Sequence, residues 1–83
     1  PQGEALSPKE DEMLVRLKAL RKRLAGEKKV PAFVVFSDAV LIQMALGRPA
    51  SESEMLQIRG IGPKKAAEYG ALFLREILLG DLV

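Results

Sequence analysis

The sequence predicts an all-α fold: a single compact helical domain over residues 7–83. Three observations lead to this prediction. Apolar residues recur at helical spacing, several segments begin with helix-capping residues, and no segment alternates with the period of two that marks a half-buried strand. The chain has 83 residues, 48% of them hydrophobic, which is enough for one core. Residues 1–6 have no periodicity and are expected to be a linker or an expression remnant.

The first helix is expected to begin after Ser7 and to end near Gly26. Ser7 is a good N-cap, and Glu10 three residues later completes a capping box. Gly26 is the expected left-handed residue at the C-terminus. One apolar stripe at helical spacing should face the core; it consists of Met13, Leu17, Leu20 and Leu24.

Residues 32–36 resemble a strand by propensity but are expected to form a short helical turn. An isolated strand of this length would have no partner, because no other segment alternates. The next helix should be capped by Ser37 or Asp38 and should stop at the sequence Gly47-Arg48-Pro49.

Two more helices are expected after this stop. A second capping box over residues 51–54 opens a short helix. After a tight turn at Gly60-Ile61-Gly62, the last helix should run from Pro63 to about Leu79 and be closed by Gly80. Gly70 inside that helix predicts close packing against another helix, because glycine there costs about 1 kcal/mol relative to alanine.

Composition excludes most catalytic chemistry. The chain has no cysteine and no histidine, so it lacks the commonest general base and the commonest zinc ligands. The carboxylates cluster at predicted helix starts, where capping explains them, and the lysine pair 64–65 lacks the glycine-rich spacing of a phosphate-binding loop. We therefore expect no catalytic residue, no metal and no cofactor. The absence of a membrane-length apolar run and of a signal peptide predicts an intracellular location.

Positive charge is concentrated in one stretch of the chain. Residues 16–29 hold seven cations against one acid, a local charge of +6, whereas the whole chain carries only +2. Such clustering favours a polyanionic partner. The alternative is an ordinary solvated helix face.

The turn at residues 58–65 has the form of a helix–hairpin–helix. Its glycines would let the backbone approach a phosphate, and Lys64 and Lys65 stand in the first turn of a helix, where they oppose the helix dipole unless an anion is bound. The alternative is a simple turn with two exposed lysines. Phe33, directly after the lysines at 28 and 29, is either a base-stacking residue or part of the core, whereas Phe36 and Tyr69 are expected in the core.

Several of these motifs together resemble the HRDC domain, the helicase and RNase D C-terminal domain. The matching residues are Val30-Pro31-Ala32-Phe33-Val34-Val35-Phe36-Ser37-Asp38, the hairpin Ile58-Arg59-Gly60-Ile61-Gly62, and Lys65, Tyr69-Gly70 and Phe73. The resemblance covers roughly residues 7–79 and is stronger to the RecQ-helicase branch. It implies a five-helix bundle that serves as an auxiliary module of an ATP-dependent DNA helicase active in DNA repair and recombination. RecQ-type members often carry tyrosine at the position of Phe33; phenylalanine keeps the stacking face and loses the hydroxyl.

Two functions remain open from the sequence. The first is modest binding of single-stranded or partly duplex DNA that tunes substrate choice. The second is docking on the helicase core or another protein, with weak or no DNA binding. A free-standing nuclease is rejected for want of metal-binding carboxylates. The DNA-binding hypothesis requires its cations to converge on one side of the bundle and not to be interleaved with carboxylates that neutralise them; otherwise the docking role is favoured. Its site residues are Lys22, Lys28, Lys29, Phe33, Lys64 and Lys65.

Overall fold

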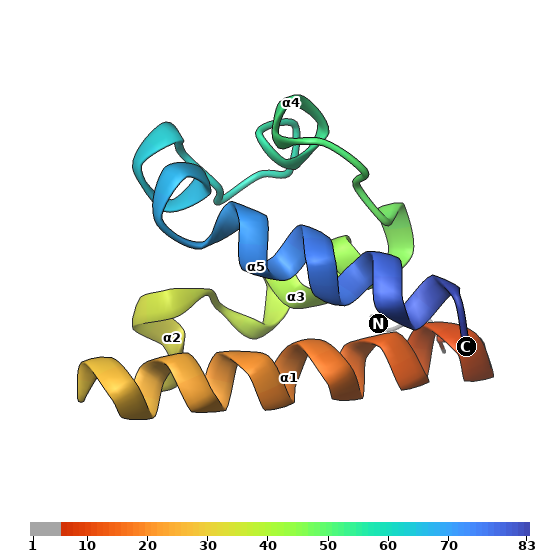
Figure 1. Ribbon diagram of the computed structural model, residues 1–83, viewed down its shortest axis with the longest axis horizontal. Coiled ribbons are helices and arrows are strands. Elements are labelled where there is room, and N and C mark those ends of the chain that lie inside the picture. The colour runs from red at the N-terminus through yellow and green to blue at the C-terminus, as the bar shows by residue number, and fades with distance from the viewer. Residues whose placement is uncertain (1–5) are drawn as a thin grey trace.

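A computed structural model describes residues 6–83, so most of the expected linker lies outside the described residues. This part of the chain is helical and contains no strand, which confirms the all-α prediction. None of its helices is long and apolar enough to cross a membrane. The helices are α1 (Pro8–Lys28), α2 (Ala32–Val35), α3 (Asp38–Gly47), α4 (Glu52–Met55) and α5 (Pro63–Asp81), arranged as Figure 1 shows.

Helix α1 begins as predicted but ends later than predicted. The Ser7 hydroxyl accepts the Glu10 N–H, and the Glu10 carboxylate accepts the Ser7 N–H, which confirms the capping box. The prediction that Gly26 ends the helix is wrong. Lys29 adopts the left-handed conformation instead, with φ 59°, and its N–H reaches back to the carbonyls of the last turn. The short loop to Pro31 sets this end point, because proline cannot continue the helix.

Helices α2 and α3 follow the sequence prediction closely. Residues 32–35 form one helical turn, which confirms the rejection of a strand. Ser37 is the N-cap of α3, and its hydroxyl accepts the Val40 N–H. Helix α3 ends at Arg48, which is left-handed with φ 46°.

The segment between α3 and α5 is short and irregular. Ser51 caps α4 by accepting the Glu54 N–H at 3.1 Å. The second half of the predicted capping box does not form, because the Glu54 carboxylate accepts the N–H of Ala50 instead. Gly60 has φ +99°, and a Cβ there would lie 2.8 Å from a methyl carbon of Val40. The tight turn therefore needs glycine at position 60 for both its conformation and its space.

Helix α5 corrects two predictions about glycine. Gly80 does not close the helix, which continues to Asp81; it lies where a Cβ would stand 2.7 Å from the Met13 methyl carbon, so its role is close approach to α1. Gly70 is buried, but a Cβ there would meet no atom of another element within 4 Å. The predicted close helix packing at Gly70 is therefore wrong.

The core lies where α1, α3 and α5 meet. Phe36 is at its centre, 1% exposed, with its ring edge-on to Tyr69 at 5.8 Å and to Phe73 at 5.1 Å between centroids. These contacts confirm Phe36 and Tyr69 as core residues. The predicted stripe of α1 is buried throughout, and no polar or charged residue among residues 6–83 is buried.

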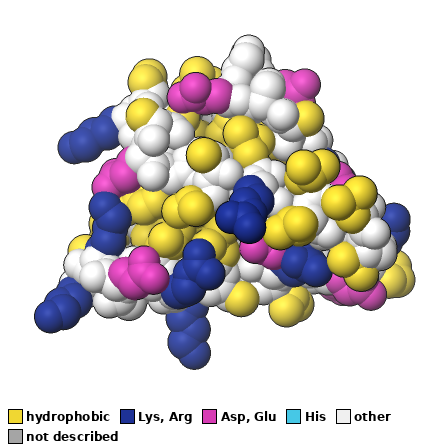
Figure 2. Space-filling view, in the orientation of Figure 1, with side chains coloured by type: hydrophobic (Ala, Val, Ile, Leu, Met, Phe, Trp, Pro, Cys, Tyr) yellow, Lys and Arg dark blue, Asp and Glu magenta, His cyan; other side chains and the backbone are white. Residues whose placement is uncertain are grey.

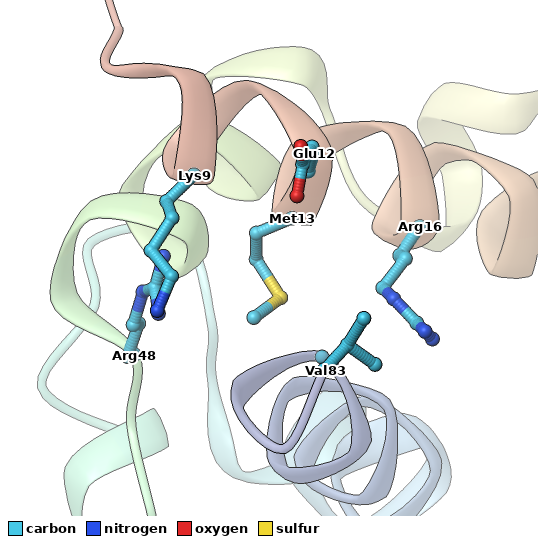
Figure 3. Close-up of a pocket in the computed structure, with 7 residues that line it drawn as sticks. Lys9, Glu12, Met13, Arg16, Arg48 and Val83 are labelled. Atoms are coloured by element: carbon cyan, nitrogen blue, oxygen red, sulfur yellow. The ribbon is translucent and has the colours of Figure 1, made fainter.

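The start of α1 and the end of α5 lie side by side. Lys9, Met13 and Val83 line one small pocket between them, which Figure 3 shows. Arg16 on α1 pairs with Glu76 on α5 at 2.6 Å, and Arg48 at the end of α3 pairs with Asp81. These ion pairs fasten this end of the bundle.

Candidate nucleic-acid interface

The opposite end of the bundle gathers most of the predicted site residues. The C-terminal end of α1, the short helix α2 and the first turns of α5 meet there, on the left of Figure 1. Figure 2 shows Lys and Arg side chains projecting along this side of the molecule, with hydrophobic side chains and some Asp or Glu side chains between them. We call this region the cation corner. It carries Lys28, Lys29, Phe33, Lys64 and Lys65.

Lys28 links α1 to α5 within the cation corner. Its ammonium forms an ion pair with Glu68 and lies 5.2 Å from the centroid of the Tyr69 ring. The hydrogen bond to Glu68, with a further contribution from its charge, raises the pKa of Lys28 above its ordinary value. Lys28 is thus positioned by an acid and a ring face that both belong to α5.

Lys65 links α5 to α2. Its Nζ donates a hydrogen bond to the Val34 carbonyl oxygen at 2.7 Å and lies 5.9 Å from the centroid of the Phe36 ring. This hydrogen bond satisfies one of the C-terminal carbonyls of α2, a four-residue helix that has no side-chain cap at its N-terminus. Lys65 therefore has a structural role, and its three-donor ammonium keeps capacity for an additional acceptor.

Glu68 lies among three lysines of the cation corner, Lys28, Lys64 and Lys65, and it was not among the residues predicted from the sequence. It follows Lys64 and Lys65 by one helical turn, and it contacts Lys28 across the helix interface. The hydrogen bond from Lys28 lowers its pKa below the ordinary value, helped by the charges of Lys28, Lys64 and Lys65. The spacing of Glu68 from the lysine pair was visible in the sequence; its contact with Lys28 was not.

Phe33 is the exposed aromatic side chain of the cation corner. It stands on α2 with 69% of its surface exposed, beside the partly exposed Val34. The core alternative for Phe33 is therefore wrong. Phe33 belongs to the same short helix whose Val34 carbonyl accepts the Lys65 hydrogen bond, and an exposed aromatic ring can stack on a base.

The cations of residues 16–29 do not all belong to the cation corner. Three of the arginines form ion pairs elsewhere: Arg16 with Glu76, Arg21 with Asp38, and Arg23 with Glu27. The Arg21 side chain is 12% exposed, and it also donates to the Phe36 carbonyl oxygen at 3.0 Å. The charges of Arg16 and Arg21 are therefore engaged within the fold, whereas Arg23 pairs with Glu27 on the exposed surface of α1.

Lys22 and Lys29 lie on the surface of α1 and of its C-cap. Both are exposed, and neither forms an ion pair within residues 6–83. Lys29 is part of the cation corner. Lys22 lies six residues before Lys28, roughly 9 Å back along the helix axis. It therefore stands apart from the lysines of the cation corner.

The turn at Gly60-Ile61-Gly62 places the start of α5 at the cation corner. Gly62 is the N-cap of α5 and has no side chain to bond the first free N–H groups of the helix. Lys64 is exposed in that first turn and forms no ion pair within the described part of the chain. Free N–H groups, a helix dipole and a lysine together favour a bound anion. Arg59, which precedes Gly60, is a further exposed cation of the hairpin that the predicted site omitted.

The cation corner brings together lysines from α1 and α5. No group of three or more acidic, histidine or cysteine residues within residues 6–83 could hold a metal ion. Four lysines and one exposed aromatic ring make up the cation corner, and the carboxylate of Glu68 lies among these lysines.

The fold and the hairpin define a class of protein: a small helical domain with a helix–hairpin–helix turn. Comparison with known proteins identifies the family. The HRDC domain model matches residues 10–77, and the chain belongs to the HRDC domain family. The resemblance read from the sequence is thereby confirmed.

Two curated relatives and one solved structure support the assignment. The chain is 49% identical over 67 residues to ATP-dependent DNA helicase RecQ of Bacillus subtilis, and 36% identical over 77 residues to that of Pasteurella multocida. These matches cover 81% and 93% of the chain but only 11% and 12% of the relatives' lengths. The solved structure "D. radiodurans RecQ HRDC domain 3" matches with a TM-score of 0.82 and 31% identity, over 84% of this chain and 92% of that one. The chain thus corresponds to one module of these helicases and not to a whole helicase.

Proposed function

We propose that this domain is an auxiliary DNA-binding module of a RecQ-type DNA helicase. It contacts single-stranded or partly duplex DNA with modest affinity inside the cell and tunes the substrate choice of the helicase that carries it. The curated relatives support the parent activity, since both are DNA helicases by name. The unwinding activity belongs to the rest of such a protein.

The observation that supports DNA binding best is the convergence of lysines from two distant segments. Residues 28–29 and 64–65 are far apart in the sequence, yet Lys28 pairs with Glu68 one turn beyond Lys64 and Lys65, and Lys65 contacts α2, the helix that carries the exposed Phe33. Lysines contribute the phosphate contacts, which act on any sequence. Phe33 contributes a stacking face, which favours unpaired bases over a closed duplex.

The test is a fluorescence anisotropy titration of the isolated domain with labelled single-stranded DNA at several salt concentrations. Three to four phosphate contacts on a single strand predict that log K falls with log salt at a slope of about −2 to −3. Binding that ignores salt, or no binding at about 50 μM protein, would reject the proposal in favour of protein docking.

Two alanine variants locate the contact. Lys64→Ala should weaken binding and reduce the slope by about 0.7, because one phosphate contact is lost. Lys9→Ala removes the same charge at the opposite end of the bundle, where Figure 3 places Lys9, and should leave binding unchanged. Equal losses from both variants would show a diffuse charge effect instead of a site.

A further inference from the structure

A carboxylate stands at the centre of the proposed phosphate site. Glu68 is paired with Lys28 and lies one turn from Lys64 and Lys65 on the same helix. Capping explains the acids at the starts of α1 and α4, but Glu68 lies in the second turn of α5 and caps nothing. Its only hydrogen-bond partner within residues 6–83 is the ammonium of Lys28.

We propose that Glu68 is an internal competitor for phosphate. In the free domain it occupies Lys28, and a phosphate of a bound strand takes its place. The inference rests on the proposed DNA-binding function and names the residue that limits affinity at that site. Glu68 thereby makes binding modest and selects strands that can place a phosphate against Lys28.

The geometry of the pair suits such an exchange. The side chains of Lys28 and Glu68 are 43% and 38% exposed, so neither has to leave a buried position and water screens their attraction. The Tyr69 ring at 5.2 Å faces the Lys28 ammonium independently of Glu68. When the carboxylate moves away, this ring still holds the ammonium at the cation corner. A phosphate oxygen then accepts the hydrogen bond that the Glu68 carboxylate accepted.

The size of the effect follows from counting one phosphate contact. Each contact on a single strand contributes about 0.7 to the salt slope. In wild type a phosphate gains the Lys28 contact only by breaking the Lys28–Glu68 pair, so the net gain at Lys28 is close to zero, whereas removing the Glu68 charge restores one full contact. Binding should therefore tighten about eightfold at about 50 mM salt and about threefold at about 200 mM, and the gain should vanish towards 1 M.

The experiment compares Glu68→Gln with wild type and with Glu76→Gln in the same anisotropy titration. Glu76→Gln is a matched control, because it makes the same charge change on the same helix and also breaks an α1–α5 ion pair, at the far end of the bundle. Glu68→Gln should bind about eightfold more tightly at about 50 mM salt, with a slope steeper by about 0.7. Glu76→Gln should stay within about twofold of wild type, since its charge lies away from the site.

A double variant tests whether the gain passes through Lys28. In the Lys28→Ala background, the effect of Glu68→Gln should fall from about eightfold to less than about threefold, because only general repulsion by the carboxylate remains. An undiminished gain would overturn the competition mechanism. Circular dichroism verifies folding, and Glu68→Ala, which keeps a good helix former at an exposed position, serves if the glutamine variant is poorly folded.

The outcomes separate this inference from the function on which it rests. If wild type binds DNA and Glu68→Gln binds equally well, or if Glu76→Gln gains as much, the role of Glu68 is wrong and DNA binding stands. If neither wild type nor Glu68→Gln binds, both proposals fall. If only Glu68→Gln binds, competition by Glu68 is strong enough to mask the site, and the inference is supported.

Discussion

Lys29 closes α1 in a conformation that an L-residue adopts at a cost. Its φ of 59° and ψ of 45° lie in the left-handed region, which glycine occupies without strain. Replacing Lys29 with glycine should therefore stabilise the fold by about 0.5–1 kcal/mol, after allowing for the greater freedom of glycine in the unfolded chain. Non-glycine residues in this region are often held there for function, and Lys29 belongs to the cation corner.

The expected shift in melting temperature follows from the size of the domain. The entropy of unfolding is about 2.1 cal/mol/K per residue, or about 0.17 kcal/mol/K for 83 residues. A gain of 0.5–1 kcal/mol thus raises the Tm by about 3–6 °C, which thermal unfolding by circular dichroism resolves. The same variant should bind DNA more weakly, by about eightfold at about 50 mM salt, because one phosphate contact is lost.

Lys29→Ala separates strain from charge. It removes the same cation but keeps a Cβ in the left-handed conformation. Its DNA affinity should match that of Lys29→Gly, whereas its Tm should stay close to that of wild type. A glycine variant that melts no higher than the alanine variant, or that binds DNA as well as wild type, would refute the reasoning.

Three other predictions follow from the structure. Phe33→Ala should weaken single-stranded DNA binding about 5- to 150-fold in anisotropy titrations, the value of one base stack, and leave the Tm unchanged because the ring is 69% exposed. Gly70→Ala should raise the Tm by about 6 °C, since its Cβ meets open space, and Gly80→Ala should raise it less, since the methionine packed on that glycine must shift. The hydrogen bond from Arg21, and then the charge of Arg21, lowers the pKa of Asp38 below its ordinary value. The stability that this lowered pKa contributes is present above about pH 4 and is lost as pH falls through the folded-state pKa. Asp38→Asn should therefore weaken the dependence of the free energy of unfolding on acidic pH, measured by urea unfolding at several pH values.

Local signals were sufficient to predict most of the fold. Ser7 and Ser37 are helix starts because a short side-chain oxygen can accept a free N–H, and this depends only on nearby residues. The spacing of Met13, Leu17 and Leu20 fixed which face of α1 would be buried for the same reason. The family motifs then narrowed an all-helical bundle to one architecture.

The incorrect predictions concern glycines whose roles depend on contacts with residues farther away in the sequence. Gly26 was a reasonable helix stop, but the loop to Pro31 moves the turn to Lys29. Gly70 and Gly80 are both glycines of α5, and only the position of Met13 on α1 shows which of them needs a small residue. Such distinctions depend on which helix faces the position.

The sequence predicted which lysines belong to the candidate site, but it did not predict which cations form ion pairs with acids. Lys28 and Lys64 were both expected as phosphate contacts, and the structure brings them to one corner. The sequence could not show that Glu68 lies between them, because the Lys28–Glu68 pair joins residues 40 positions apart. The charge of Arg21 was similarly counted as available, although its guanidinium holds the α2–α3 connection.

The neighbouring outer ends of α1 and α5 determine how a larger protein can carry this domain. Lys9 and Val83 line the same pocket, and α1 places the cation corner on the order of 30 Å away from it. Polypeptide joined before α1 or after α5 therefore leaves from one pole of the bundle, while the lysines face outward from the other. A domain with this arrangement can be joined through flexible linkers, or repeated in series, without a linker crossing the cation corner.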